Sequence, residues 1–495
     1  MIRSNVTYSA ALAVLILSLI FSIPAHSQPM TLQDVIAEAR TNSVQALEAR
    51  SAFVSDYWSW RSYQASHLPS VHLYGTVGSF DRSLRLLQNY ETGEMVYTEN
   101  YNMENSIGLS VRQNITATGG TLTMYNDLTR IDQFGTGGLT WYAQPFTVSY
   151  SQPLFSYNRF KWDKLISPKQ YEKAKRVYLE SMEKVTLSAV DAYFDVMVAQ
   201  ETMDAAVRNH DNTARMLSIA GERLLLGTVT RDEYLQLELR MLNDSIAVSE
   251  DGVSLRKARM QLNSLLRLDE SHEVETVLED ELPDVVLEYA RVQELVDANS
   301  SLGLAGSIEI LNAESAVASA KASRGVTMQL NARFGLSKTS PELAQVYRNL
   351  PDQEVVGLTF SIPIFDWGEG KGKVRKAEAA ADVIRAQVER EWNDMRISLY
   401  TAVGQFNNQR RLCDVSRRAS LVAAERYSLM MEKFSAGNAS VTDLNTARSE
   451  SDAATAKYIA DVSSYWRYYY TLRKLTLHDF IARADLEVDY SEMTR

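Results

Sequence analysis

Few residues of this chain have the types and spacing that chemistry requires. The run GEGKGK at residues 368–373 invites comparison with a phosphate-binding loop. That loop needs four residues between its glycine and the Gly-Lys pair, followed by Ser or Thr, whereas here Val374 follows Lys373. These lysines are better interpreted as a solvated segment at the start of a helix or beside lipid headgroups.

The other chemically capable residues are isolated from one another. The histidines have neither the HExxH spacing nor a comparable ligand set, so the sequence predicts no metal site. No GxSxG motif provides a nucleophilic serine, and the single cysteine, Cys413, lies in a helical pattern. We therefore expect no catalytic residue, no cofactor and no disulfide, with Cys413 as a buried packing residue.

The N-terminus has the composition of an export signal. Arg3 supplies a positive charge, residues 11–21 form a short apolar run, and small residues at 25–27 suit cleavage. Residues 1–27 are therefore interpreted as a signal peptide, too short for a transmembrane helix. Losing Arg3 changes the formal net charge from −11 to −12. An acidic chain without a basic block argues against nucleic acid as a partner.

A two-fold internal repeat organises the rest of the chain. Pro153 and Phe155 stand where an alternating pattern ends, and Pro363 and Phe365 stand 210 positions later at the end of a similar pattern. A very long helical pattern follows each. Its apolar residues recur at steps of three and four, which is typical of a coiled-coil seam, and adding 210 reproduces the first seam except at Gln409.

Each long helical pattern ends at a glycine, Gly227 in the first copy and Gly437 in the second, again 210 apart. A second helix follows each turn. The expected long helices are 168–226 and 231–267 in the first copy, and 371–436 and 441–477 in the second. Helices are also expected before the strands, over 31–66 and 291–324.

Alternating patterns predict the strands, about 71–80 and 146–155 in the first copy, and about 328–337 and 355–365 in the second. An extra hairpin is expected at about 105–131, after a polar loop at 81–104. The domains are then a first repeat at 28–267, a linker at 268–290, a second repeat at 291–477 and a C-terminal tail at 478–495. Strands of about ten residues suit a tilted bilayer crossing, but two hairpins cannot close a barrel, so several chains would have to share one.

Together, the PLF and PIFDWG strand exits, the paired glycine turns and the duplication resemble the TolC-like outer-membrane efflux protein family. The resemblance implies a mainly α fold with membrane β-structure: a homotrimer with a joint transmembrane β-barrel and a long periplasmic α-helical coiled-coil barrel. It implies a passive exit duct of a tripartite efflux pump or type I secretion system, in the cell outer membrane and extending into the periplasm. Its partners would be a periplasmic adaptor, an inner-membrane transporter and outer-membrane lipid.

The extra hairpin departs from the family's two strands per repeat. If it joined the wall, each chain would contribute six strands and a trimer eighteen. Its polar composition favours a place outside the wall, as an extracellular elaboration.

The resemblance also places a pore constriction just past the glycine turns, at Asp443, with Glu233 and Asp232 as acidic residues of the first turn. The next ring position, Thr446, lacks a charge. Phe434 and Ala439 stand where the family often has a linking tyrosine and arginine, so the locking network would differ. Alternatively, Asp443 is only a helix-start carboxylate near the N-terminal dipole.

A second hypothesis is a periplasmic coiled-coil scaffold or adaptor, which would leave the bilayer-length strands unexplained. The exported substrate, whether drug, metal ion or protein, is not encoded in any feature of the sequence.

Overall fold

The computed structural model describes residues 29–88, 92–135, 137–270, 272–278 and 281–494, so the expected signal peptide at 1–27 lies outside the described residues. The chain forms two compact units. The sheet unit is made of the described residues of Ala52–Val177, Ser300–Met395 and Asp489–Arg495. The helical unit is made of those of Met1–Ser51, Tyr178–Asn299 and Arg396–Val488. Each unit therefore draws on both expected repeats.

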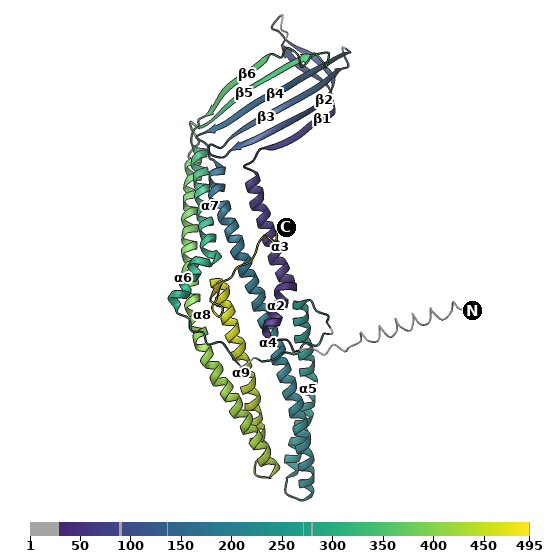
Figure 1. Ribbon diagram of the computed structural model, residues 1–495, viewed down its shortest axis with the longest axis vertical. Coiled ribbons are helices and arrows are strands. Elements are labelled where there is room, and N and C mark those ends of the chain that lie inside the picture. Colours follow the sequence, from purple (N-terminus) through teal and green to yellow (C-terminus); the bar gives the residue numbers. More distant parts are fainter. Residues whose placement is uncertain (1–28, 89–91, 136, 271, 279–280, 495) are drawn as a thin grey trace, which may run out of the picture. The chain divides into compact units, whose positions relative to one another are not determined.

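Helices run through both units (Figure 1). They are α2 (Leu32–Asn42), α3 (Val44–Ala65), α4 (Arg159–Leu225), α5 (Arg231–Leu266), α6 (Tyr289–Asn299), α7 (Ser301–Arg324), α8 (Glu369–Ser435) and α9 (Val441–Thr476). α4 and α8 each have 67 residues, and α5 and α9 each have 36, as a duplicated segment would. Among the described residues, no helix is long and apolar enough to cross a membrane.

Three of the expected helices differ from the sequence-based expectation, and one of them, over 291–324, is divided at Ser300 into α6 and α7. α4 begins at Arg159, so Pro168 lies inside the helix and not at its start. Proline removes one backbone N–H, and because Pro168 is exposed, water can satisfy the carbonyl that loses its partner. The helix expected over 31–66 is interrupted at Ser43, whose side chain accepts a hydrogen bond from the Ala46 N–H at 3.1 Å and so begins α3.

The apolar seam of each long helix is largely buried. Ala174, Met182, Val185, Ala189 and Val196 of α4 are buried, as are Ala381, Val388, Leu399 and Phe406 of α8. Gln409, where the repeated pattern fails, is also buried, and its Nε2 donates to the Asp461 backbone oxygen at 2.9 Å. The seam thus tolerates one polar residue because that residue is hydrogen-bonded.

Six strands form one antiparallel sheet in sequence order (Figure 1). They are β1 (Ser70–Gln88), β2 (Met95–Ile115), β3 (Gly120–Gln133), β4 (Gly138–Leu154), β5 (Thr327–Ser340) and β6 (Asp352–Ser361). In this order, every junction with a helix lies at the same end of the strands, because β1 and β5 begin there while β4 and β6 end there. Two short strands, β7 (His478–Asp479) and β8 (Ala484–Asp485), pair separately in the tail.

Two expectations about the first copy were wrong. The extra hairpin at 105–131 does not lie outside the wall, because β2 pairs with β1 along its length and β3 pairs with β4. Residues 81–104 are not one loop, since β1 continues to Gln88 and β2 starts at Met95. The polar composition misled the prediction because an antiparallel sheet with one polar face needs polar residues at every second position.

A bulge explains why the sequence pattern predicted only the first half of β1. Between Thr76 and Ser79 the register with β2 shifts by one residue, with Gly78 at φ +68° and its N–H donating to Asn105 Oδ1 at 2.8 Å. A bulge exchanges the faces of the residues beyond it. Apolar residues therefore change from odd positions, as at Leu73, to even positions, as at Leu84, while staying on one face.

That face is apolar across the sheet and exposed in the single chain. Cross-strand pairs on it include Leu73 with Leu109, Met124 with Val148, Val148 with Phe334, and Leu330 with Leu358. Leu73 is 73% exposed, Phe334 47% and Leu358 52%. The opposite face carries polar pairs such as His72 with Ser110 and Thr123 with Ser149. The register places a few polar residues, such as Glu354 opposite Phe334, on the same face, but a sheet that exposes so many apolar side chains needs something apolar to cover them.

Candidate functional site

Two helical hairpins of the helical unit end in turns of the same construction. Gly227 joins α4 to α5 and Gly437 joins α8 to α9, with φ of +74° and +83°. In each turn the N–H of the next residue donates to a carbonyl five residues earlier, at 3.0 Å and 2.8 Å respectively. A left-handed residue is required there, which is why glycine stands at both positions.

Two of the three acidic residues expected at the constriction, Glu233 and Asp443, take part in helix capping in the single chain. Thr230 and Glu233 form a capping box at the start of α5, and Ser440 and Asp443 form one at the start of α9. The Asp443 carboxylate accepts the Ser440 hydroxyl at 2.7 Å, and this bond and that from the Ser440 N–H lower the pKa of Asp443. Hydrogen bonds from Thr230 likewise lower the pKa of Glu233.

Within one chain, the carboxylate of Asp443 therefore bonds back to its own N-cap and is exposed. This is the helix-start role that the sequence left open. Asp232 is exposed as well and accepts a hydrogen bond from Gln236 Nε2 at 2.8 Å. Thus the structure places Asp443, Glu233 and Asp232 in the first turns of α9 and α5, and their role in a pore remains a prediction.

An apolar cluster packs the turns together. Its buried members are Met216, Ala220, Leu237, Phe434, Val441 and Leu444. Phe434 and Ala439, which stand where the family was expected to place polar linking residues, both belong to this cluster, Ala439 as a partly buried member. The two turns are therefore joined by apolar packing at these positions.

Arg223 connects the two turns and was not identified from the sequence. It lies in the last turn of α4, and its guanidinium donates to the backbone oxygens of Phe434 and Ser435, at 3.2 Å and 2.5 Å. These are carbonyls at the end of α8, where the helix dipole favours a cation. A single arginine near a glycine turn carries no periodic signal that could have revealed this contact.

A buried ion pair between α5 and α9 was also missed. Asp244 is 3% exposed and Arg448 is 9% exposed. Two Arg448 nitrogens donate to the two Asp244 oxygens at 2.9 Å and 3.1 Å, and the Thr213 hydroxyl donates to Asp244 at 2.6 Å. The only available signal was the presence of charged residues at positions where the helical pattern calls for apolar ones.

The strand exits connect β4 to α4 and β6 to α8. Phe155 adopts φ +57° and is 75% exposed, and Phe365 is 71% exposed. Past Phe365, the Asp366 carboxylate accepts the N–H groups of Gly368 and Gly370 at 2.9 Å and 2.8 Å, which lowers the pKa of Asp366. The Asp366 carboxylate thus accepts the hydrogen bonds that these backbone N–H groups would donate to phosphate in a phosphate-binding loop.

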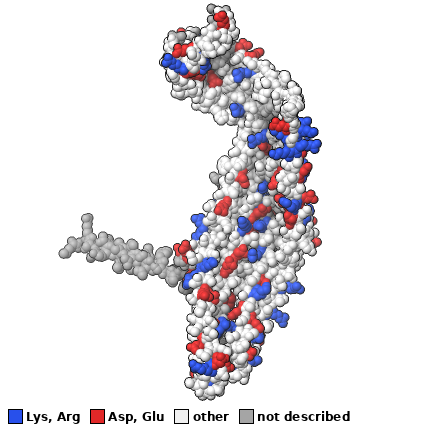
Figure 2. All heavy atoms as spheres, turned by 180° about the vertical axis from the view of Figure 1, so that it is seen from behind, with Lys and Arg blue, Asp and Glu red and all other residues white. Residues whose placement is uncertain are grey.

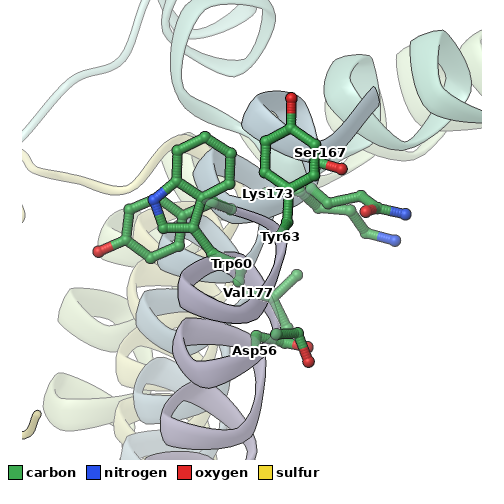
Figure 3. Close-up of a pocket in the computed structure, with 10 residues that line it drawn as sticks. Asp56, Trp60, Tyr63, Ser167, Lys173 and Val177 are labelled. Atoms are coloured by element: carbon green, nitrogen blue, oxygen red, sulfur yellow. The ribbon is translucent and has the colours of Figure 1, made fainter. Parts of the chain in front are cut away.

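The sheet unit also has an aromatic pocket of about 520 Å³ between α3 and α4 (Figure 3). The rings of Trp60 and Tyr171 are stacked with centroids 5.6 Å apart, and Tyr63 stacks on Trp60 at 5.2 Å. Asp56 and Lys173 also line the pocket. Most of the aromatic surface is thus used in packing α3 against α4. Among the described residues, no group of three or more His, Cys, Asp or Glu could hold a metal ion.

The sequence model of the outer membrane efflux protein family matches residues 301–476, which confirms the resemblance over most of the second repeat. Comparison with curated protein sequences gave no significant match.

Solved structures extend the resemblance to nearly the whole chain. The CmeC outer membrane channel of Campylobacter jejuni is 16% identical, with a TM-score of 0.63, over 93% of this chain and 88% of that one. The outer membrane protein VceC of Vibrio cholerae is 13% identical, with a TM-score of 0.61, over 92% and 97%. The outer-membrane channel OprN is 15% identical, with a TM-score of 0.63, over 90% and 89%. The chain therefore has the TolC-like channel fold.

Proposed function

We propose that this chain, which has the TolC-like fold and matches the outer membrane efflux protein family, is the outer-membrane exit duct of an export machine that crosses the periplasm. The observation that carries the proposal is the sheet, whose apolar face is left exposed and whose junctions with helices all lie at the same end of the strands. A sheet inserted in the outer membrane would cover that face with lipid and place the helices that join its strands on the periplasmic side.

A closed barrel requires several chains, because β1 and β6 are the two edges of the sheet. Three chains of six strands would give eighteen strands, enough to leave an aqueous channel. We propose a homotrimer on this basis.

The helices offer a second surface for the same assembly. Along α5, exposed apolar residues recur at heptad spacing: Leu235, Leu239, Leu242, Ile246, Val253 and Met260. Leu239 and Leu242 are each 61% exposed. A stripe of this spacing is the seam of a coiled coil, and a helix of a second copy is the proposed occupant. A periplasmic adaptor and an inner-membrane transporter would complete the machine as partners of the trimer.

Membrane fractionation tests the function directly. We expect the protein in the outer-membrane fraction, released by detergent as a species with the mass of three chains. Recovery as a soluble periplasmic monomer or dimer would instead favour a scaffold and overturn the duct.

A substitution on the apolar face should interfere with insertion. Leu358→Arg places a charge on the face proposed to meet lipid, and we expect a cost on the order of 2 kcal/mol and a reduced yield of assembled trimer. Thr359→Arg is the matched control, because Thr359 is also exposed, on the opposite face of β6. The yield is measured by quantitative immunoblotting of the detergent-extracted trimer. Equal yields from the two variants would contradict the assignment of the lipid-facing side.

We further propose that the three copies of Asp443 form the acidic constriction of the channel. Asp443 is exposed and forms no ion pair among the described residues, although the charge of Arg426 contributes to lowering its pKa. Asp443→Asn removes the charge while keeping a side-chain oxygen for the Ser440 cap. We expect weaker cation selectivity and weaker block by multivalent cations in planar bilayers, with Glu425→Gln on α8 as a control. Unchanged selectivity would remove Asp443 from the pore.

A further inference from the structure

The four places where helices of the sheet unit meet strands carry a concentration of positive charge. They are residues 61–70, 155–164, 321–327 and 362–376. These segments hold ten Lys and Arg against three Asp and Glu, a net charge of +7, in a chain whose formal net charge is −11. Figure 2 shows Lys and Arg side chains gathered beside the sheet, where the helices begin. All four segments lie at the same end of the strands because neighbouring strands of the sheet run in opposite directions.

Most of these cations are not used within the chain. Arg159 pairs with Asp163, and the charge of Arg324 acts on the Asp366 carboxylate. The cations that have neither kind of partner among the described residues are Arg61, Lys161, Lys164, Lys371, Arg375 and Lys376, and all six are exposed. By contrast, Lys373 pairs with Glu369 at 2.6 Å and Lys321 pairs with Glu378 at 3.0 Å. Six unpaired cations at one end of the sheet's strands repel one another, so an external anion would stabilise them.

Helix stability does not account for the positions of two of these cations. Lys161 lies in the first turn of α4 and Lys371 in the first turn of α8, where the positive end of the helix dipole disfavours a cation. α4 has no acidic residue in its first turn to compensate. These two lysines therefore stand where the helices gain least from them, which points to a partner outside the chain.

The neighbouring residues indicate what kind of partner this is. Between the strand ends and the cations stand Phe155, Ile364, Phe365 and Trp367, which are 75%, 95%, 71% and 90% exposed. Exposed apolar and aromatic residues followed by Lys and Arg form the arrangement of a membrane interface, where aromatic rings sit at headgroup level and cations reach phosphate. Since Asp366 occupies the N–H groups at the start of α8, recognition would rely on the flexible lysine and arginine side chains.

We propose that these six cations form a collar that binds the phosphate groups of anionic phospholipids in the leaflet next to the helices. The inference rests on the proposed insertion of the sheet in the outer membrane. The collar would fix the depth of the sheet in the bilayer and hold a shell of anionic lipid around the channel. Simple ion pairing to side chains at an exposed surface suits a lipid headgroup, which needs no enclosed pocket.

Quenching by brominated lipid tests the collar. The full-length protein is reconstituted in phosphatidylcholine bilayers, and quenching of tryptophan fluorescence by brominated phosphatidylglycerol is compared with that by brominated phosphatidylcholine. Trp162 and Trp367 lie beside the collar and report on it. We expect wild type to prefer phosphatidylglycerol, and Lys371→Gln with Lys376→Gln to lose about fivefold in relative affinity for each lysine.

Matched variants keep the result interpretable. Arg390→Gln with Arg418→Gln removes two exposed charges from the same helix, away from the strands, and should leave the preference unchanged. Lys371→Arg with Lys376→Arg keeps the charge and should retain the preference. The collar is overturned if the glutamine variant prefers phosphatidylglycerol as strongly as wild type.

Two further measurements distinguish lipid binding from binding of free phosphate and from failure to insert in the bilayer. If inorganic phosphate abolishes the preference at an ionic strength where chloride does not, the cations form a site for free phosphate, which would overturn the lipid assignment. If the protein does not enter bilayers at all, the proposed function fails together with the collar. Insertion as a trimer without lipid preference would remove the collar alone.

Discussion

Replacing Arg448 with methionine is expected to lower the free energy of unfolding of the helical unit by about 3–5 kcal/mol. Its partner Asp244 is 3% exposed, so the variant leaves a carboxylate buried without its main counter-charge. Arg240 Nε lies 3.3 Å from an Asp244 oxygen. This single contact does not replace the two hydrogen bonds that Arg448 donates to the Asp244 carboxylate. The measurement is urea denaturation of the detergent-purified protein followed by circular dichroism.

The same helices offer a matched control. Arg426 of α8 and Glu450 of α9 form an ion pair whose side chains are 45% and 51% exposed. Since exposed pairs contribute little, Arg426→Met should cost less than about 1 kcal/mol. A double variant, Asp244→Leu with Arg448→Met, should recover much of the loss because the only charge left without its partner is that of Arg240, whose side chain is 33% exposed. Equal effects of Arg448→Met and Arg426→Met would show that the buried pair is not desolvated.

The pH dependence of this effect has a definite sign. Burial raises the pKa of Asp244, but hydrogen bonds from Arg448 and Thr213 outweigh it and leave the pKa below its ordinary value. A lowered carboxyl pKa stabilises the fold above the ordinary value of about 3.9, and the contribution is lost as pH falls through the folded-state pKa. Without Arg448, burial dominates and Asp244 can protonate. The difference between wild type and Arg448→Met should therefore be largest near neutral pH and shrink in acid.

Removing the carboxylate of Glu183 is the second substitution for which a large loss is expected, again about 3–5 kcal/mol. Glu183 is fully buried in α4. Its oxygens lie 2.7 Å from Arg40 Nη1 of α2 and 3.2 Å from Arg473 Nε of α9. Arg473 in turn lies 2.9 Å from Asp479 in the tail. Glu183→Ala would leave two arginines, 27% and 17% exposed, without the anion between them.

The control is again an exposed pair between the same two helices. Asp191 of α4 and Arg467 of α9 approach to 2.9 Å, with side chains 49% and 58% exposed. Asp191→Ala should therefore change the free energy of unfolding by less than about 1 kcal/mol. Glu183→Gln keeps the shape and one acceptor, and should fall between the two. A loss below 1 kcal/mol for Glu183→Ala would mean that water replaces the carboxylate between the arginines.

The sequence by itself determined the features that depend on neighbouring residues. Gly227 and Gly437 marked the hairpin turns because only glycine adopts the left-handed backbone there at no cost. Thr230 and Ser440 begin α5 and α9 by capping, a local effect that the expected boundaries at 231 and 441 already contained. The presence and order of the long helices followed from apolar spacing, which repeats regularly enough to be recognised along one chain, although the start of α4 at Arg159 did not.

Only the tertiary structure decided what depends on contacts between distant segments. The place of β2 and β3 in the sheet rests on pairing with β1 and β4, and the bulge at Gly78 moved the apolar residues from odd to even positions, which hid the second half of β1. The charge pairs of Asp244 and Glu183 were invisible for the same reason. A buried charge is stable only beside a partner, and that partner lies 204 residues away in one case and 143 in the other.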